Sequence, residues 1–461
     1  MKAVRNPQQK NSITQFEKMT ATPIPRLVLE LSVPAVISML VTNIYNLVDT
    51  AFVGQLGTSA SGAVGVVFGF MSIIQAFGFL FGQGAGSLMS RALGTKDRES
   101  ADLHASVGFF SSFLCGSLIC LLGFAFLDEI VFWLGSTETI APFAKTYISY
   151  ILISAPFMCS CLTLNNILRY EGKAFLGMIG LMSGAVLNMA GDPILMFGLK
   201  MGIAGAGLST ALSQIVSWGI LLWMFLSGRT ESKISLRNAA HVTPRIIGNI
   251  AATGLPSLLR QALNSVTTVL LNTHCAVYGD EAVAAMSIVS RIIFFAFSVA
   301  LGIGQGFQPV SAFNYGAGKY DRLRKGFRFA CFASEGFILI SCTAIFAFSG
   351  SLIGLFRDDP RVIEIGTRAL RLQSLATLVL PPCMVVEMLL QTTGRRLGAS
   401  VLTSLRSGLF FIPALMILSR VRGLAGIQEA QPVALMITVP IVVIFAVVFF
   451  RRLPKEDVVK R

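Results

Sequence analysis

The chain has 461 residues, of which 54% are hydrophobic and only 13% are charged, and its formal net charge is +14. This composition excludes an ordinary soluble globule and predicts an all-α polytopic membrane protein. The positive charge implies no nucleic-acid partner, because it is spread over short loops. We expect these loops to contact anionic lipid head groups instead.

Apolar stretches long enough to cross a bilayer recur along the whole chain. We predict twelve transmembrane helices at residues 27–54, 60–90, 104–127, 141–165, 175–199, 203–228, 247–276, 283–313, 327–355, 363–392, 397–419 and 424–450. The first 26 residues are polar and basic and contain no apolar segment of their own. They are therefore expected to form a cytoplasmic tail and not a cleaved signal.

Loops rich in Lys and Arg alternate along the chain with weakly charged loops, and this alternation predicts how the protein is oriented in the membrane. Basic residues concentrate in both tails and in every second connection, after the second, fourth, sixth, eighth and tenth stretches. Only Lys200, Arg357, Arg361, Arg420 and Arg422 weaken the pattern. Because basic loops stay in the cytoplasm, we expect a multi-pass protein of the cell membrane (inner or plasma membrane) with both termini cytoplasmic.

The two halves of the chain resemble each other. Gly82-Gln83-Gly84 recurs 222 positions later as Gly304-Gln305-Gly306. The same spacing relates Pro34 to Pro256, Gly57 to Gly279, Gly94 to Gly316 and Gly172 to Gly394. Many transporters are built from such repeats. We therefore predict two pseudo-symmetric six-helix bundles, at 27–228 and 247–450, joined by a cytoplasmic loop at 229–246 and flanked by tails at 1–26 and 451–461.

One acid lies inside the first apolar stretch, in Thr42-Asn43-Ile44-Tyr45-Asn46-Leu47-Val48-Asp49-Thr50. At helical spacing Asp49 shares a face with Thr42 and with Tyr45 or Asn46. A carboxylate at membrane depth is costly and normally marks an ion or substrate pathway. The alternative is an acid that reaches the interface from a helix end. The repeat argues against this alternative, because the position equivalent to Asp49 is Leu271 and the scaffold does not require an acid there.

A second acid lies in Asn188-Met189-Ala190-Gly191-Asp192-Pro193. Asn188 and Asp192 are one turn apart and share a helix face. Pro193 cannot donate a hydrogen bond to the carbonyl of Met189, which leaves that oxygen free. With Ser209 and Thr210 of the next stretch, these groups could hold a proton or a small cation. A structural kink with a capped end is the alternative.

These segments carry a family resemblance. Asn-Leu-Val-Asp-Thr-Ala-Phe-Val-Gly at 46–54, Gly-Gln-Gly-Ala-Gly at 82–86, Leu-Arg-Tyr-Glu-Gly at 168–172 and Asn-x-x-x-Asp-Pro-Ile at 188–194 resemble the multidrug and toxic compound extrusion (MATE) transporters. The likeness is greatest to their MepA/DinF-like prokaryotic branch. It implies a V-shaped pair of bundles that exports bulky, often cationic or aromatic compounds against H⁺ or Na⁺. Matching of the motifs places the family's cation site at Asp49, Asn188, Asp192 and Thr210.

The second half departs from the acid-bearing pattern of some family branches. Its first stretch offers Arg260, Gln261 and Asn264 but no acid, and the stretch after it carries Arg291. With Tyr45 and Asn46 of the first half, these residues are candidates for a substrate site. Two further acids, Glu335 and Glu387, lie inside apolar stretches. Glu387 could bind a cationic drug or a second proton, but we favour an ion pair with Arg260, Arg291 or Arg371 that locks the fold.

We therefore expect a secondary active exporter of drugs or toxic metabolites that works by alternating access. It should act as a monomer and need no cofactor beyond the coupling ion. Sodium is the main alternative to the proton as the coupling ion, because Asn188 and Thr210 supply oxygen ligands. A flippase for lipid-linked saccharides is the alternative, although the paired acids favour cationic or neutral cargo. An enzyme is not expected, because neither a metalloprotease motif nor a nucleophile elbow is present.

Overall fold

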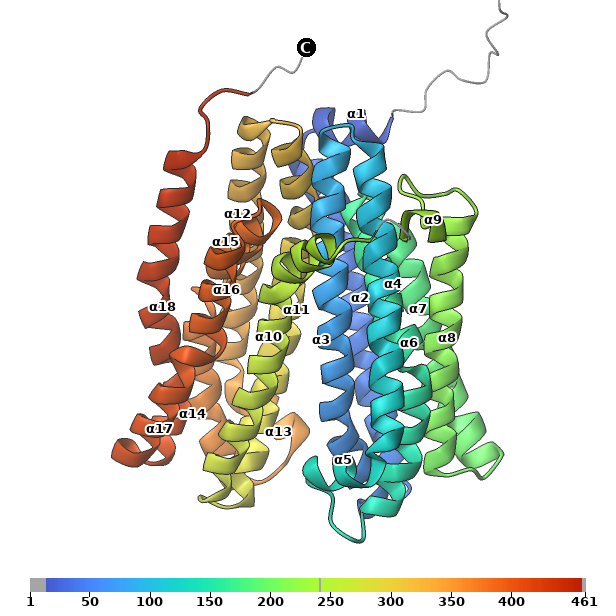
Figure 1. Cartoon of the computed structure of the whole chain (residues 1–461). Coiled ribbons are helices and arrows are strands. Elements are labelled where there is room, and N and C mark those ends of the chain that lie inside the picture. The colour runs from blue at the N-terminus through green and yellow to red at the C-terminus, as the bar shows by residue number, and fades with distance from the viewer. Residues whose placement is uncertain (1–13, 240–241, 458–461) are drawn as a thin grey trace, which may run out of the picture.

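The computed structural model describes residues 14–239 and 242–457, and every regular element in these ranges is a helix. The expected tails extend outside the described residues at 1–13 and 458–461. Figure 1 shows the helices grouped in two bundles, which we call the N-lobe (right) and the C-lobe (left). Both ends of the described chain lie at the same end of the molecule, here called the terminal end.

The N-lobe contains the helices of the first half of the chain. They are α1 (Gln15–Ala21), α2 (Ile24–Gly54), α3 (Thr58–Gly94), α4 (Arg98–Ala125), α5 (Leu127–Trp133), α6 (Ala141–Tyr170), α7 (Ala174–Pro193) with a π-helical turn at Ile194–Gly198, and α8 (Ile203–Leu226). A short helix, α9 (Leu236–Ala239), lies in the connection to the second half.

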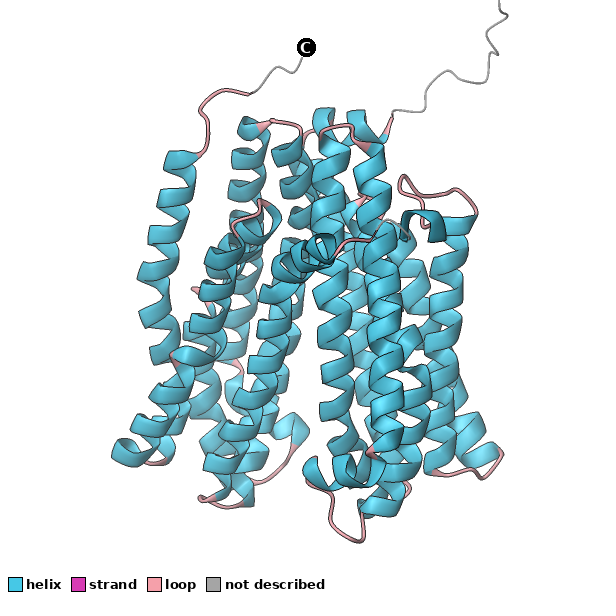
Figure 2. Ribbon diagram, viewed as in Figure 1, coloured by secondary structure: helices cyan, strands magenta, loops and turns pink. Residues whose placement is uncertain are grey.

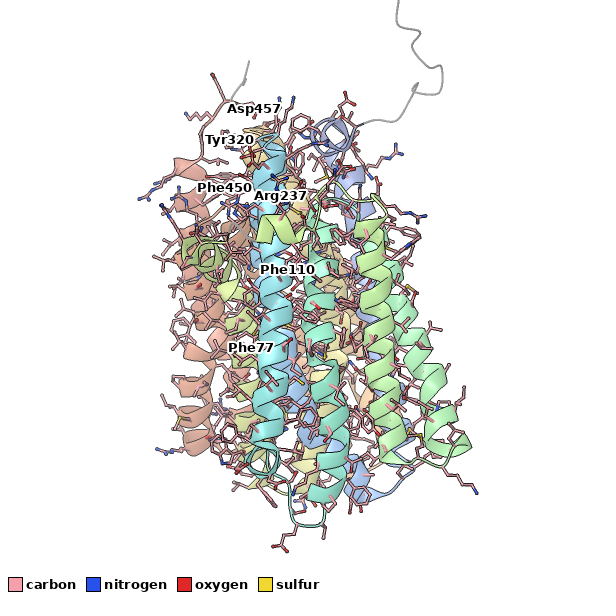
Figure 3. All side chains as sticks on the ribbon, turned by 45° about the vertical axis from the view of Figure 1, so that its right-hand side comes forward. Phe77, Phe110, Arg237, Tyr320, Phe450 and Asp457 are labelled. Atoms are coloured by element: carbon pink, nitrogen blue, oxygen red, sulfur yellow. The ribbon has the colours of Figure 1, made fainter. Side chains whose placement is uncertain are left out.

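The C-lobe contains the remaining helices. They are α10 (Pro244–Ala276), α11 (Asp280–Gly316), α12 (Tyr320–Ala347), α13 (Ser349–Phe356), α14 (Pro360–Thr377), α15 (Leu380–Thr392), α16 (Arg396–Ser404) with a π-helical segment at Leu405–Leu409, α17 (Phe411–Arg422) and α18 (Leu424–Arg452). The C-terminal segment folds back on this lobe, where Asp457 accepts a hydrogen bond from the backbone of Asp321, beside Tyr320 (Figure 3).

Most of these helices have the length and apolarity of membrane spans. Ten helical segments of the described chain qualify, and α14 with α15 forms an eleventh span that bends by 47°. Among the twelve predicted spans, only α10 does not qualify. It is 33 residues long and runs alongside the others, but it carries many polar side chains.

Equivalent turns of the two halves have the same backbone conformation. Gly172 and Gly394 have φ of 83° and 85°, and Gly57 and Gly279 have φ of 111° and 97°. These are left-handed values that disfavour residues with a Cβ atom. The predicted internal repeat is therefore visible in the geometry of the chain and not only in its residue types.

The two lobes meet through four long helices, α2 and α3 of the N-lobe and α10 and α11 of the C-lobe. Glycines allow the backbones to approach closely at these crossings. A Cβ atom on Gly254 would lie 1.8 Å from the carbonyl oxygen of Leu80, and one on Gly84 would lie 2.1 Å from that of Ile250. Gly302 and Gly306 are placed in the same way against Val36 and Ser32 of α2.

Polar side chains reinforce the contact between the lobes. Gln308 donates to Gln83 at 2.8 Å, and Asn43 donates to Ser298 at 2.8 Å. Arg169, at the end of α6, donates to Gln305. All of these contacts lie between the terminal end and about the middle of the helices. Beyond them the lobes diverge, as the ribbons in Figure 2 also indicate.

The connection between the lobes is fastened to the N-lobe by Glu171, the residue that follows α6. The Glu171 carboxylate is fully buried and accepts hydrogen bonds from the backbone N–H groups of Glu231 and Ser232. Lys173 forms an ion pair with Glu231 at 3.1 Å. The inter-lobe loop, expected at 229–246 as a polar connection, thus packs against the terminal end of the N-lobe in its first part.

Candidate functional site

The four residues assigned to an ion site lie on three neighbouring helices of the N-lobe. Asp49 is on α2, Asn188 and Asp192 are on α7, and Thr210 is on α8. Asp192 has no exposed surface, and Asn188 and Thr210 are buried as well. The structure therefore brings Asp49 next to Asp192, although the two lie about 140 positions apart in the sequence. Their helices, α2 and α7, are in contact.

Glycines on one face of α7 let α8 approach closely enough to complete this cluster. A Cβ atom on Gly191 would lie 2.6 Å from the hydroxyl of Ser209, and one on Gly184 would lie 2.0 Å from the hydroxyl of Ser217. Because Asn188 is less than one turn from Gly191, its side chain is held within reach of α8. Small residues thus position the polar ones.

Asn188 is the centre of the hydrogen-bond network. Its amide nitrogen lies 3.3 Å from each of three oxygens, those of Asp192, Ser209 and Thr210. In return, the Ser209 hydroxyl donates to the Asn188 backbone carbonyl at 3.2 Å. The network fixes the Asp192 carboxyl group with neutral partners alone, and no cation of the described residues forms an ion pair with it.

The Asp49 carboxyl group lies within hydrogen-bonding reach of Asp192. One oxygen of each, Asp49 Oδ1 and Asp192 Oδ2, has no other partner among the described residues, and the same holds for the side-chain oxygen of Asn188. Two adjacent carboxylates in a site of low dielectric constant repel each other strongly. Such a pair is stable only if it shares a proton or holds a cation.

Two tyrosines border the pair. Tyr45, one turn before Asp49 on α2, and Tyr147 on α6 both lie close enough to interact with the two acids. Tyr45 is one of the residues predicted to contact substrate, whereas the sequence predicts no role for Tyr147. Tyr147 is buried in an apolar cluster of the N-lobe, and nothing in its local sequence distinguishes it from a core residue.

In the C-lobe, Glu387 is balanced by two arginines. Arg260 approaches one carboxylate oxygen at 3.2 Å and Arg406 approaches the other at 3.0 Å, and Glu387 is buried. Arg260 was one of three expected partners, whereas Arg291 and Arg371 do not take part. Arg406 was not singled out, because the fold alone brings α16 and its π-helical segment next to α15. Buried pairing of this kind fits the predicted lock.

The remaining candidates do not join either cluster. Gln261 and Asn46 are half-buried, and Asn264 and Arg291 are exposed. Glu335, on α12, is half-buried and has one oxygen without a partner among the described residues. An open groove of about 500 Å³ lies elsewhere, between α12, α14 and α18, and contains none of the acids of the N-lobe cluster.

Comparisons with known proteins bear on this arrangement. A family model described as MatE matches residues 34–194 and 256–417, one match in each half of the chain. The chain belongs to the MATE family. The matched segments include Asp49 and Asn188 through Asp192, and in the second half they run from within α10 to within α17. The expected family and the fold of two six-helix bundles are thereby confirmed.

Curated MATE relatives are named multidrug export proteins. The MepA protein of Staphylococcus aureus (strain NCTC 8325 / PS 47) is 28% identical over 414 residues, which cover 89% of this chain and 90% of the relative. The MepA protein of Staphylococcus haemolyticus is also 28% identical, with 87% and 88% covered. These relatives do not favour the saccharide flippase.

Solved MATE structures superpose on nearly the whole chain. A MATE protein crystallised in complex with MaL6 has a TM-score of 0.90 at 25% identity and covers 96% of this chain and 100% of its own. An outward-facing conformation of a MATE family transporter has a TM-score of 0.90 at 24% identity, with 97% and 100% covered. The chain is thus a multi-pass membrane transporter of the multidrug efflux family.

Proposed function

We propose that this MATE protein is a secondary active exporter that moves bulky drugs or toxic metabolites out of the cell by antiport. The observation that carries the proposal is the pair formed by half-buried Asp49 and fully buried Asp192, which needs a proton or a cation to be stable. A group of this kind changes its charge when the ion arrives or leaves. A change of charge in a membrane interior is large enough to alter helix packing.

Helix α2 connects the ion site with the contact between the lobes. It carries Asp49 on one side, and it carries Ser32, Val36 and Asn43 against α11. When Asp49 loses its ion, the two carboxylates repel, and α2 shifts relative to α7. Because the same helix forms the contact with the C-lobe, this shift favours a different arrangement of the lobes. Alternating access follows from one rigid element shared by both sites.

The charge pattern of the loops supports a cytoplasmic terminal end, and with this orientation lobes that diverge at the other end form an outward-facing state. In this state an external proton reaches Asp49 and Asp192 and neutralises the pair. The cargo then leaves to the outside, because protonation removes negative charge that held a cationic group. Both lobes come from one chain and enclose the pathway together, and we propose that the protein works as a monomer.

We propose the proton as the coupling ion. The Asn188 amide group donates to the available oxygens, which leaves the carboxyl pair as the group that can accept a proton. Sodium remains the alternative to be tested, because three oxygens without partners, those of Asp49, Asn188 and Asp192, could also act as ligands.

The proposal predicts that efflux depends on both acids. In proteoliposomes that contain a fluorescent dye, an imposed pH gradient should drive export by the wild-type protein. Asp49→Asn and Asp192→Asn should each lower the rate of proton-driven export by at least about tenfold, since an amide cannot exchange a proton. Asp128→Asn is the matched control, because Asp128 is largely exposed and pairs with Lys145 at the far end of the molecule.

Full proton-driven export by Asp49→Asn would disprove the coupling role. The coupling ion is decided in the same vesicles by imposing the pH gradient in sodium-free buffer and, separately, a sodium gradient at equal pH. Export under the first condition alone supports the proton. Export under the sodium gradient alone would identify sodium as the coupling ion, and the proposal that the protein is an antiporting exporter would still stand.

A further inference from the structure

Arg291 of α11 lies on the face of that helix that looks towards the N-lobe. Ser298, on the same helix, accepts a hydrogen bond from Asn43 of α2 across the contact between the lobes. Arg291 precedes Ser298 by seven residues, or two helical turns, so it has the same direction about the helix axis. It lies farther from the terminal end, where the lobes have diverged, and its side chain is exposed.

The C-lobe wall around Arg291 is mixed, with exposed Phe295 one turn further along α11 and polar side chains on α10. Gly254 marks the face of α10 that contacts the N-lobe. Gln261 and Thr268 follow it by seven and fourteen residues and therefore continue the same face past the contact. Thr268 is exposed and Gln261 is half-buried. This stripe explains why α10 is too polar for a lipid-facing span. It faces the space between the lobes.

The opposite wall presents exposed apolar side chains beside Thr50. On α2, Leu47 follows Asn43 by one turn and is 46% exposed. On α3, Ile73 precedes Leu80 by two turns and is 47% exposed. Both continue the faces that hold the lobes together nearer the terminal end. Polar groups on the C-lobe side and apolar side chains on both sides thus border the space between the lobes, which is the surface expected for an amphiphilic cargo.

Arg291 forms no ion pair with an acid in the described ranges. It makes no hydrogen bond or ion pair with the residues that the structure describes. The acids that could have neutralised it are occupied elsewhere. Glu387 binds Arg260 and Arg406, and Asp49 lies beside Asp192. The residue opposite Arg291 is Thr50, because α2 and α11 run antiparallel and Asn43 is paired with Ser298.

We infer that Arg291 binds an acidic group of the cargo, so that the exported compounds are amphiphiles that carry a carboxylate or a comparable anion. A guanidinium group binds a carboxylate through two parallel hydrogen bonds. The acidic group lies on the C-lobe wall, and the apolar part of the compound covers Leu47 and Ile73. A cationic group elsewhere in the cargo is compatible with this arrangement, since Arg291 is on α11 of the C-lobe and the acid pair is in the N-lobe.

This inference rests on the proposed export function, but its test does not require transport. We would measure binding of a rhodamine dye with a free carboxylate, and of the methyl ester of the same dye, to the full-length protein in detergent by fluorescence anisotropy. The two dyes differ only in the acidic group. The wild-type protein should bind the acid at least about tenfold more tightly, the effect expected from one hydrogen-bonded charge pair.

Arg291→Gln should remove this preference by weakening only the binding of the acid, and Arg291→Lys should restore part of it. Arg420→Gln, which removes an exposed arginine at the same end of the C-lobe, should bind both dyes as the wild type does. Retained binding of the ester by Arg291→Gln shows that the variant is folded.

A wild-type protein that binds both dyes equally, or an Arg291→Gln variant that keeps the preference, would overturn the inference. Dye export in proteoliposomes separates this result from the proposed function. If the inference alone is wrong, the acid and its ester are exported with equal efficiency. If the export function is wrong, neither dye moves under any ion gradient, whatever the binding measurements give.

Discussion

Three buried carboxyl groups of this chain are stabilised in three different ways, and the difference decides what each can do. Glu387 faces two arginines, so its charge is fixed by its neighbours. Asp192 has only an amide and hydroxyl groups around it and a second acid beside it. Its charge can therefore change with the arrival of an ion. Glu171 is held by backbone N–H groups at the membrane boundary.

Glu171 should make the docking of the inter-lobe loop sensitive to pH. Burial raises the pKa of Glu171 to about 7, although hydrogen bonds from Ser232 and Glu231 and the charge of Lys173 act in the opposite direction. The folded protein therefore binds this proton more tightly than the unfolded chain does. Its stabilising effect is complete below the ordinary pKa of a glutamate and decreases as the pH rises towards 7.

We predict that Glu171→Gln, which resembles the protonated form, unfolds at the same temperature as the wild type at pH 5 and at a higher temperature at pH 8. The measurement is a thermal unfolding series of both proteins in detergent. Asp321→Asn is the control, because Asp321 belongs to an exposed pair with Lys325 that is worth little. A wild type that gains stability over Glu171→Gln with rising pH would contradict the prediction.

At the scale of helices, the contact between the lobes depends on glycines that face backbone atoms of the other lobe. A methyl group on Gly254 would meet the carbonyl oxygen of Leu80, which cannot move unless α3 moves with it. We predict that Gly254→Ala separates α10 from α3 at the terminal end and lowers the population of the closed arrangement. Spin labels at Thr95→Cys and Arg245→Cys should report a longer distance between the lobes.

Gly248→Ala provides the matched control for this crossing. It lies earlier on the same helix, and a Cβ atom there would have no neighbour within 4 Å. Because alanine favours a helix over glycine by about 1 kcal/mol, this variant should be as stable as the wild type or slightly more stable. An unchanged distance distribution in Gly254→Ala would show that the crossing is not tight enough to control the position of the lobes.

The sequence predicts the membrane-spanning helices better than it predicts the side-chain contacts between them. Apolar periodicity and the 222-residue repeat were sufficient for the spans and for the two bundles, because both depend on local or evenly spaced residues. The pairing of Arg406 with Glu387 and the position of Tyr147 beside the acids depend on which helices become neighbours. No spacing within a single helix contains that information. The bend between α14 and α15 was also not predicted.

Helix α10 is more polar than the other spans, and this polarity is informative. Its hydropathy is too low for a typical membrane span. The chain nevertheless has to cross the membrane at α10, because the following helices would otherwise have the wrong orientation. Its polar residues repeat with helical period on one face and continue the contact made by Gly254. A span that is too polar for lipid is expected wherever one face borders water. The polarity of α10 therefore locates the space between the lobes.

At the scale of the whole molecule, the closed terminal end and the diverging opposite end predict which positions water can reach. On the inter-lobe face of α10, Ile250 is buried against Gly84 of α3, whereas Thr268 is exposed. We predict that a membrane-impermeant maleimide added outside intact cells labels Thr268→Cys and not Ile250→Cys. Wild-type protein with its eight native cysteines gives the background.

The same pair of variants also tests the orientation of the protein. If the terminal end were outside the cell, the reagent would reach Thr268→Cys only in inverted membrane vesicles, whose cytoplasmic face is accessible. If the lobes were mainly closed at the far end instead, Thr268→Cys would be protected and Ile250→Cys would react from the cytoplasmic side. Labelling of Thr268→Cys from outside alone agrees with cytoplasmic termini and an outward-facing state, because only that combination exposes this face of α10 to the external solution.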